Sequence, residues 1–163
     1  RAHASTRYTK RTTLTIQQLK ATLLVDTATN AVLDVHVTTT RKHDTWIAPQ
    51  VVKRNAASIA VLTGDKGYDD QKLRQLARDH GIRLLIKHRE FTSLDKAWNA
   101  RLDGDLYYQR NVNETVNAAI KQKFGAFVRS RRWWKQFREL LIKCVVHNVE
   151  RGLAISDDEC EYP

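Results

Sequence analysis

Two stretches of strand-forming residues, separated by a short polar segment, restrict how this chain can begin to fold. Residues 19–26 contain an apolar run, and residues 31–39 alternate apolar and polar side chains. The segment 27–30 between them consists of residues that are common in turns. The pattern therefore predicts two antiparallel strands joined as a hairpin.

Helical and strand patterns alternate after the hairpin. Strands that are joined through single helices predict a parallel arrangement, so we expect a mixed α/β fold with a partly parallel sheet and flanking helices. We expect Asp44 or Thr45 to cap the first helix and Asp69 or Asp70 to cap the second, which should end at His80-Gly81. The expected elements are a helix to about residue 57, a strand over 59–62, a helix to residue 80, a strand over 82–86, and helices over 93–102, 107–124 and 133–152.

The charge of the chain is uneven. Lys and Arg number 28 against 18 Asp and Glu, which gives a net charge of +10. Residues 156–163 contain four acids and no base, so the remaining body carries +14. We expect one mixed α/β domain over residues 1–155 and a disordered acidic tail over 156–163. Such a basic body favours a polyanionic partner, first nucleic acid and second an anionic membrane surface, although a merely soluble basic surface would also explain it.

Other classes of protein are disfavoured by composition. No apolar run approaches the roughly 18 residues of a membrane-spanning helix, so we expect a soluble protein of the cytoplasm. The two cysteines, Cys144 and Cys160, cannot form a disulfide framework or a multi-cysteine metal site. Cys144 lies in an apolar helical pattern and is expected in the core.

Asp65 is the first candidate for chemistry. It follows the predicted strand 59–62 and lies between Gly64 and Gly67, which allow a sharp turn. Ligands gather outside the carboxyl ends of strands in open α/β sheets, and a carboxylate is a good ligand for Mg²⁺. An ordinary turn residue is the alternative interpretation.

A polar stripe on the predicted helix 107–124 is the second candidate. At about 100° per residue, its members fall within about 80° of one another. Two structural interpretations compete with a functional one: a capping box from Asn111 to Glu114, and an i,i+4 ion pair from Arg110 to Glu114. The stripe consists of Tyr107, Arg110, Glu114, Asn117 and Lys121.

A third candidate is the basic stretch 121–138, which contains seven bases, no acid and five interleaved aromatic residues. This mixture suits contacts with the DNA backbone, most of all through Arg129, Arg131 and Arg132. A solvated helical face with core aromatics is the alternative. His43-Asp44 could suggest a metal pair, but Asp44 as a helix cap is favoured.

These positions together resemble a known family. Gly64-Asp65-Lys66-Gly67-Tyr68-Asp69, followed by Tyr107-x2-Arg110-x3-Glu114-x6-Lys121, is similar to the DDE transposases of bacterial and archaeal insertion sequences. The second string matches the Tyr-Arg-Glu-Lys signature of the insertion-sequence four/five-like group at every spacing. The similarity extends from about residue 1 to residue 152.

The resemblance implies an RNase H-like core in which three carboxylates hold two Mg²⁺ or Mn²⁺ ions. Asp65 would be the second acid and Glu114 the third, while Tyr107, Arg110 and Lys121 would position the phosphates of double-stranded DNA. It also implies cutting and joining of DNA at transposon ends and at the target, and a homodimer acting on paired ends. Paired metal ions suit such in-line phosphoryl transfer.

The chain departs from the family pattern at one position. The family's first aspartate lies on a strand before the hairpin, and no aspartate precedes Asp26. We interpret Asp26 and Asp34 as structural residues and expect the given chain to lack the first acid and the first core strand. An active transposase domain, a DNA-binding remnant without catalysis and a general nuclease of the same fold therefore all stay open.

Overall fold

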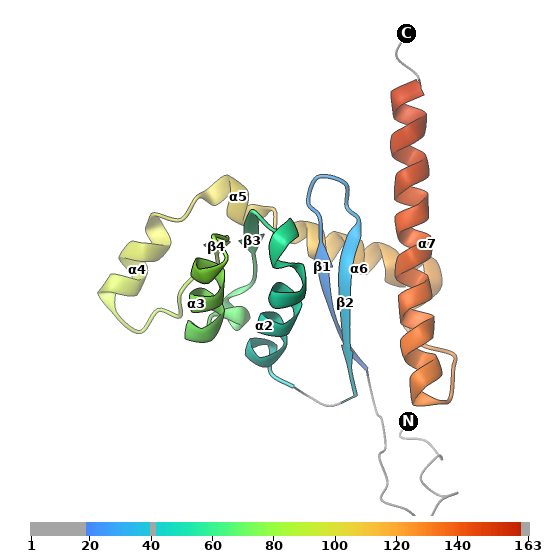
Figure 1. Ribbon diagram of the computed structural model, residues 1–163, viewed down its shortest axis with the longest axis horizontal. Coiled ribbons are helices and arrows are strands. Elements are labelled where there is room, and N and C mark those ends of the chain that lie inside the picture. Colours follow the sequence, from blue (N-terminus) through green and yellow to red (C-terminus); the bar gives the residue numbers. More distant parts are fainter. Residues whose placement is uncertain (1–18, 40–41, 161–163) are drawn as a thin grey trace, which may run out of the picture.

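The computed structural model describes residues 19–39 and 42–160 (Figure 1). The predicted hairpin is present: β1 (Lys20–Val25) pairs antiparallel with β2 (Val32–Thr38). Its turn is closed by Asp26, whose carboxylate accepts hydrogen bonds from the Thr29 backbone N–H at 3.1 Å and the Thr29 hydroxyl at 2.5 Å. These hydrogen bonds give Asp26 the structural role expected of it, and the bond from the Thr29 side chain holds the pKa of Asp26 below its usual value.

A strand–helix–strand unit forms the other side of the molecule, where β3 (Val61–Thr63) and β4 (Arg83–Leu85) pair in parallel as predicted. Asp70 caps the connecting helix α3 (Gln71–Asp79), and Gly81 follows it with a φ of +68°. The helix α2 (Asp44–Asn55) and the short helix η1 (Ala56–Ser58) precede β3. A core lies between α2, α3 and β4 and contains Ala48, Val52, Leu73, Ala77, Ile82 and Ile86.

The cap predicted for α2 is wrong. The N-cap position is His43, which makes no side-chain capping hydrogen bond. The carboxylate of Asp44 instead forms an ion pair with Lys20 at 2.5 Å, because β1 lies beside the start of the helix. The side chain that the local sequence predicted as a cap therefore makes a tertiary contact instead.

The four remaining helices are α4 (Ser93–Ala100), α5 (Gly104–Tyr108), α6 (Asn111–Phe124) and α7 (Trp133–Cys160). The helix predicted over 107–124 is divided, because backbone hydrogen bonds around residues 109–113 follow the tighter i to i−3 pattern. Helix α7 continues past the predicted end at residue 152 into the acidic segment. A single glycine costs only about 1 kcal/mol in a helix, and no proline follows Gly152 before Pro163.

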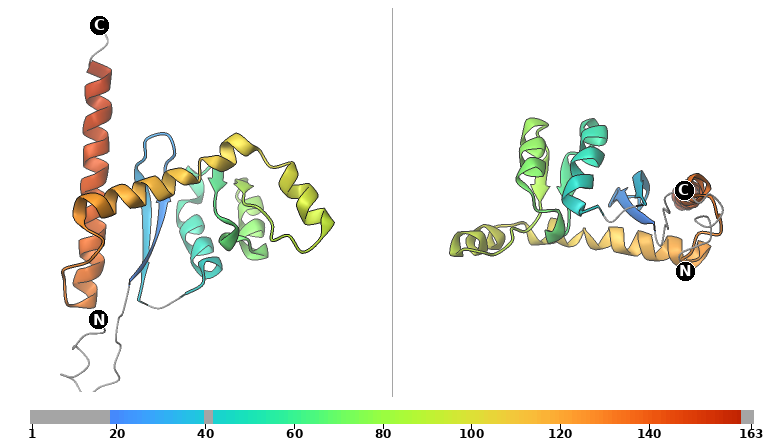
Figure 2. Two further views of the ribbon diagram at one scale, coloured as in Figure 1. Left: turned by 180° about the vertical axis from the view of Figure 1, so that it is seen from behind. Right: turned by 90° about the horizontal axis from the view of Figure 1, so that it is seen from below.

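The strands form two separate two-stranded sheets, β1–β2 and β3–β4, rather than the expected single mixed sheet. Across Figure 1 their order is β4, β3, β1, β2, so an edge of β3 faces an edge of β1. In the described part of the chain no strand hydrogen-bonds to either of these two edges. Helix α6 runs along both units, as the two views in Figure 2 show.

A second core joins the hairpin to α6 and α7. It contains Val32, Val116, Ile120 and Cys144, which confirms the core position predicted for Cys144. Asn148 of α7 reinforces the junction by exchanging two 2.8 Å hydrogen bonds with the backbone of Val32. None of the helices in the described residues has the length and apolarity needed to cross a membrane.

Candidate active site

Asp65 lies where β3 ends, as predicted. It is the N-cap of the short helix η2 (Lys66–Tyr68), and its carboxylate accepts the Lys66 backbone N–H at 2.8 Å. Its side chain is nevertheless 69% exposed. Both interpretations of Asp65 are therefore compatible with the structure: it shapes the turn, and it still offers carboxylate lone pairs to a ligand.

Glu114 reaches the same place from α6, and Arg110 lies between the two acids. One guanidinium nitrogen of Arg110 is 3.9 Å from Asp65 Oδ1 and 3.6 Å from Glu114 Oε1. The Glu114 side chain is 76% exposed. The structure thus brings together two predicted site residues separated by 49 positions in the sequence, with a cation between them.

The contact between Arg110 and Glu114 is also the ion pair that local spacing predicted. The alternative of a capping box is wrong, because the N-cap of α6 is Arg110 and no side-chain capping bond forms there. Arg110 also has a buried Nε that makes no hydrogen bond within the described residues. A buried N–H group of this kind can donate a hydrogen bond to a phosphate or carboxylate oxygen.

Tyr107 takes a different position from the one predicted. Because the helix breaks between α5 and α6, Tyr107 is buried instead of lying on an exposed polar stripe. Its ring contacts two cations, Arg110 with Cζ at 5.3 Å and Lys87 with Nζ at 4.9 Å from the centroid. Tyr107 therefore lies beside Arg110, the cation between the two acids.

Lys87 is a candidate that sequence reasoning did not single out. It follows β4 by two residues, and Asp65 follows β3 by two. Since the carboxyl ends of parallel strands meet at one edge of a sheet, the parallel pairing of β3 and β4 places both residues at that edge. The predicted strand over 82–86 ends directly before Lys87, so the rule that singled out Asp65 also applies to Lys87.

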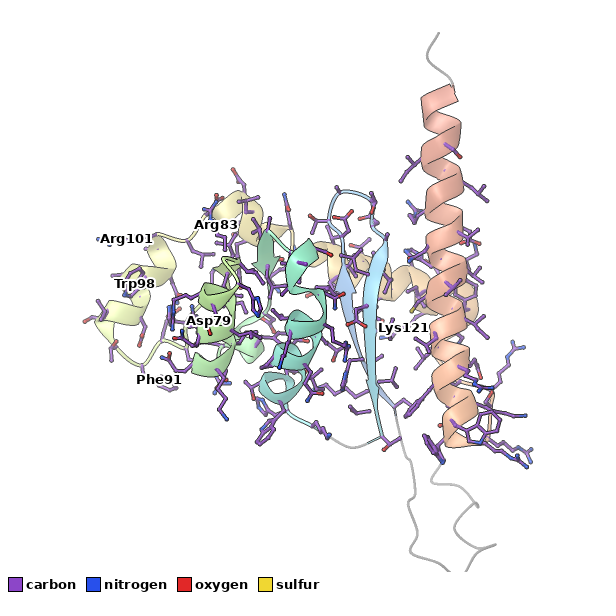
Figure 3. The ribbon with its side chains drawn as sticks, viewed as in Figure 1. Asp79, Arg83, Phe91, Trp98, Arg101 and Lys121 are labelled. Atoms are coloured by element: carbon purple, nitrogen blue, oxygen red, sulfur yellow. The ribbon has the colours of Figure 1, made fainter. Side chains whose placement is uncertain are left out.

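Lys121 is exposed on α6, two helical turns beyond Glu114 (Figure 3). A separation of seven residues puts both on the same side of the helix, roughly 10 Å apart along its axis. Lys121 therefore lies on the same side of α6 as the acids but outside their immediate contacts.

Asp34, an acidic residue of the hairpin, does not join the site. Asp34 accepts hydrogen bonds from Arg54 Nη2 at 2.6 Å and Asn55 Nδ2 at 2.7 Å. Burial pushes its pKa upward, but these bonds and the charge of Arg54 outweigh that effect and leave the pKa lowered. The contact ties β2 to the end of α2, so Asp34 has the structural role expected of it. In the described residues, no group of three His, Cys, Asp or Glu side chains is arranged to hold a metal ion.

The predicted basic residues lie at the other end of α6. Arg129, Arg131 and Arg132 are all exposed in the segment between α6 and α7. Helix α6 has 14 residues, so roughly 20 Å of helix separates this segment from the acids. A groove of about 460 Å³ opens beside it and is lined by Ser130, Trp134, Lys135, Arg138, Glu139, Ile142 and Lys143.

Glu139 fixes the course of this basic segment. Its carboxylate accepts backbone N–H bonds from Arg129 at 2.8 Å and Ser130 at 2.9 Å. Burial acts to raise the pKa of Glu139, but these bonds together with Lys143 leave it lowered. Two cations lie over the ring of Trp134: Arg138 Cζ is 5.0 Å and Lys135 Nζ is 5.4 Å from its centroid. Trp134 therefore adds an aromatic surface beside the arginines.

Comparison with known proteins identifies the family of this chain. No curated protein and no solved structure matches the chain. A family model described as "Transposase DDE domain" matches residues 1–149, a range that includes Asp65, Arg110 and Glu114. The chain therefore belongs to the family of transposases with a DDE domain.

Proposed function

We propose that this domain binds double-stranded DNA at insertion-sequence ends and takes part in metal-dependent strand cleavage and joining, as an enzyme of the four/five-like group. Membership of the family supports a function in transposition. The observation that carries the proposal is the approach of Asp65 and Glu114 to one nitrogen of Arg110. Two acids from distant segments beside basic residues suit phosphoryl transfer better than they suit a purely structural contact.

The donor set fits Mg²⁺ or Mn²⁺. Both carboxylates are exposed oxygen donors, and Mg²⁺ is commonly held by one or two carboxylates together with substrate phosphates and waters. A cationic nitrogen already lies within 4.0 Å of both acids, so the position between them favours positive charge. A divalent ion bound there would stabilise the charge that develops on phosphate oxygens.

The chain's own residues have separate roles in this proposal. Asp65 and Glu114 would hold the divalent metal ion. The η2 turn keeps Asp65 at the end of β3. Arg110, with its buried Nε, binds a DNA phosphate or a further carboxylate. Tyr107 orients Arg110 and Lys87, and Lys121 extends the basic surface along the DNA backbone.

A third carboxylate completes the proposed site from a strand between β3 and β1. The two facing sheet edges support this placement, because unpaired edges are templates for strand addition. Such a strand would convert the two small sheets into the single RNase H-like sheet expected from the resemblance. An in-frame Asp codon within an apolar strand, in the DNA directly upstream of the codon for Arg1, would support this part of the proposal.

A DNA-binding remnant without catalysis is the second candidate. It is favoured by the fact that only two acids meet at Arg110 in the described residues. The basic segment at the start of α7 would bind DNA equally well in either case. The two candidates therefore differ in cleavage and not in affinity for DNA.

The deciding experiment measures metal-dependent nicking of DNA that carries the transposon end. It compares this chain with a longer chain that contains the upstream strand. We expect the longer chain to nick DNA and to lose activity with Asp65→Asn or Glu114→Gln, while the matched control Asp79→Asn on α3 leaves it unchanged. Normal cleavage by both site variants would exclude the assigned roles, and DNA binding without nicking by either chain would favour the remnant. A strand-joining assay separates a transposase from a general nuclease.

A further inference from the structure

Helix α7 has a packed inner side and, opposite to it, an exposed apolar side. Its inner side packs on the hairpin and α6 through Cys144, His147 and Asn148. At about 100° per residue, a second apolar row lies directly opposite this inner side. We call it the outer row; it consists of Ile142, Val146, Val149 and Leu153, with exposed fractions of 61%, 37%, 56% and 60%.

The outer row has the spacing of a coiled coil. Successive members are separated by four, three and four residues, which is the alternation of core positions in a heptad repeat. In the described part of the chain, the main contacts of α7 are with β2 and α6, and the members of the outer row stay exposed. A regular apolar row of this kind predicts another helix as its partner.

The charges at the two ends of α7 indicate which helix this is. Residues 131–138, where α7 begins, carry four bases and no acid. Residues 157–160, the last four of α7, include three acids and no base. Two copies of α7 in opposite directions would therefore place the basic end of each beside the acidic end of the other, whereas parallel copies would bring like charges together.

We infer that the outer row is a homodimer interface in which two copies of α7 pack antiparallel. The interface would serve the homodimer that the family resemblance implies, and only this use of the dimer rests on the proposed function. The two-fold axis passes between Val146 and Val149, so each of these faces the other in the partner copy, and Ile142 faces Leu153. An interface of this kind is closed, because the same surface serves both copies.

The first test measures the mass of the full chain by sedimentation equilibrium, without DNA or metal ions. We expect a dimer of the 18.8 kDa chain. Val149→Glu should raise the dissociation constant at least about tenfold, because it places a charge in an apolar interface. Its circular dichroism should stay unchanged, since Val149 is exposed in the monomer. The matched control is Leu94→Glu on α4, where Leu94 is 65% exposed, and it should leave the dimer intact.

The second test determines the direction of packing. In a background with Cys160→Ser, a mixture of Ile142→Cys and Leu153→Cys chains should form cross-linked heterodimers under mild oxidation, while neither chain alone should cross-link. Added salt should weaken the dimer, because exposed charges at the two ends are screened.

A chain that stays monomeric at about 0.1 mM would overturn the inference, since even weak dimers with micromolar dissociation constants form at that concentration. A dimer that Val149→Glu leaves unchanged would equally overturn it. Self-cross-linking of each cysteine variant would overturn the antiparallel direction. None of these readouts depends on DNA cleavage, so failure of the proposed function and failure of this interface can be told apart.

Discussion

The carboxylates of Asp65 and Glu114 contact the same guanidinium nitrogen of Arg110, at 3.9 Å and 3.6 Å. Asp65 comes from the end of a strand and Glu114 from the first turn of a helix, so only the tertiary fold brings them together. The contact makes Arg110 the centre of the candidate site. A single cation held between two acids offsets half of their combined negative charge before any ligand binds.

Replacing Arg110 with methionine should weaken DNA binding while keeping most of the buried stem of the side chain. The slope of log affinity against log salt should become shallower by about 1, because one phosphate contact is lost. Fluorescence anisotropy over a salt series measures this slope. Arg78→Met, at an exposed position on α3, is the control and should leave the slope unchanged. Equal slopes for wild type and Arg110→Met would remove Arg110 from the DNA contacts.

The ion pair between Asp69 and Arg74 should matter more for stability than the exposed ion pairs do. The two side chains are only 14% and 15% exposed, and Arg74 also donates to the Ile86 carbonyl at 3.1 Å. Asp69→Ala leaves a largely buried cation without its partner and should lower the free energy of unfolding by about 3 kcal/mol. Urea denaturation measures this change.

The matched control for that prediction is Arg83→Met, which breaks the ion pair with Asp103 and leaves the Asp103 carboxylate in place as the N-cap of α5. Arg83 is well exposed, and the pair is 3.3 Å apart. Removing an exposed pair should cost less than about 1 kcal/mol. If the two variants lost the same stability, the special weight given to Asp69 and Arg74 would be wrong.

The sequence predicted those features of the fold that depend on local pattern. The hairpin, the parallel pair β3–β4, the Asp70 cap and the Gly81 stop all follow from turn chemistry and side-chain periodicity. The two acids of the candidate site were named from motif spacing and from the rule that ligands lie at strand ends.

The features that the sequence did not reveal depend on tertiary contacts. Asp44 pairs with Lys20 rather than capping its helix, because a distant strand supplies the cation. Tyr107 is buried, and the chain tightens between α5 and α6, so Tyr107 and Glu114 do not lie on one continuous helix. Periodicity assumes one continuous helix and cannot show such a break. The separation of the two sheets could not be predicted either, since it depends on which edges find a partner.

The contact between Asp34 and α2 predicts a dependence of stability on pH. Although burial alone would raise the pKa of Asp34, the bonds from Arg54 and Asn55 lower it below the value of 3.8 for an unperturbed group. The unfolded state therefore binds the proton more tightly than the folded state does. The stabilisation is complete above the unfolded pKa and is lost as the pH falls through the folded pKa. Urea titrations between about pH 6 and about pH 3 should show a steeper loss for wild type than for Asp34→Asn.

Glu139 should control the basic segment without touching DNA itself. Its carboxylate accepts the backbone N–H groups of Arg129 and Ser130, so it fixes the segment that carries the exposed arginines. Glu139→Ala should free this segment and raise the dissociation constant for DNA by about threefold to tenfold, because ordering the segment then opposes binding. Removing a negative charge would by itself tighten binding to DNA, so weaker binding identifies the positioning effect. The comparison variant is Glu150→Ala, which removes the same charge from α7 at its contact with Lys123 and should bind DNA at least as tightly as wild type. Tighter binding by Glu139→Ala, measured by anisotropy, would show that the segment needs no fixed conformation to bind DNA.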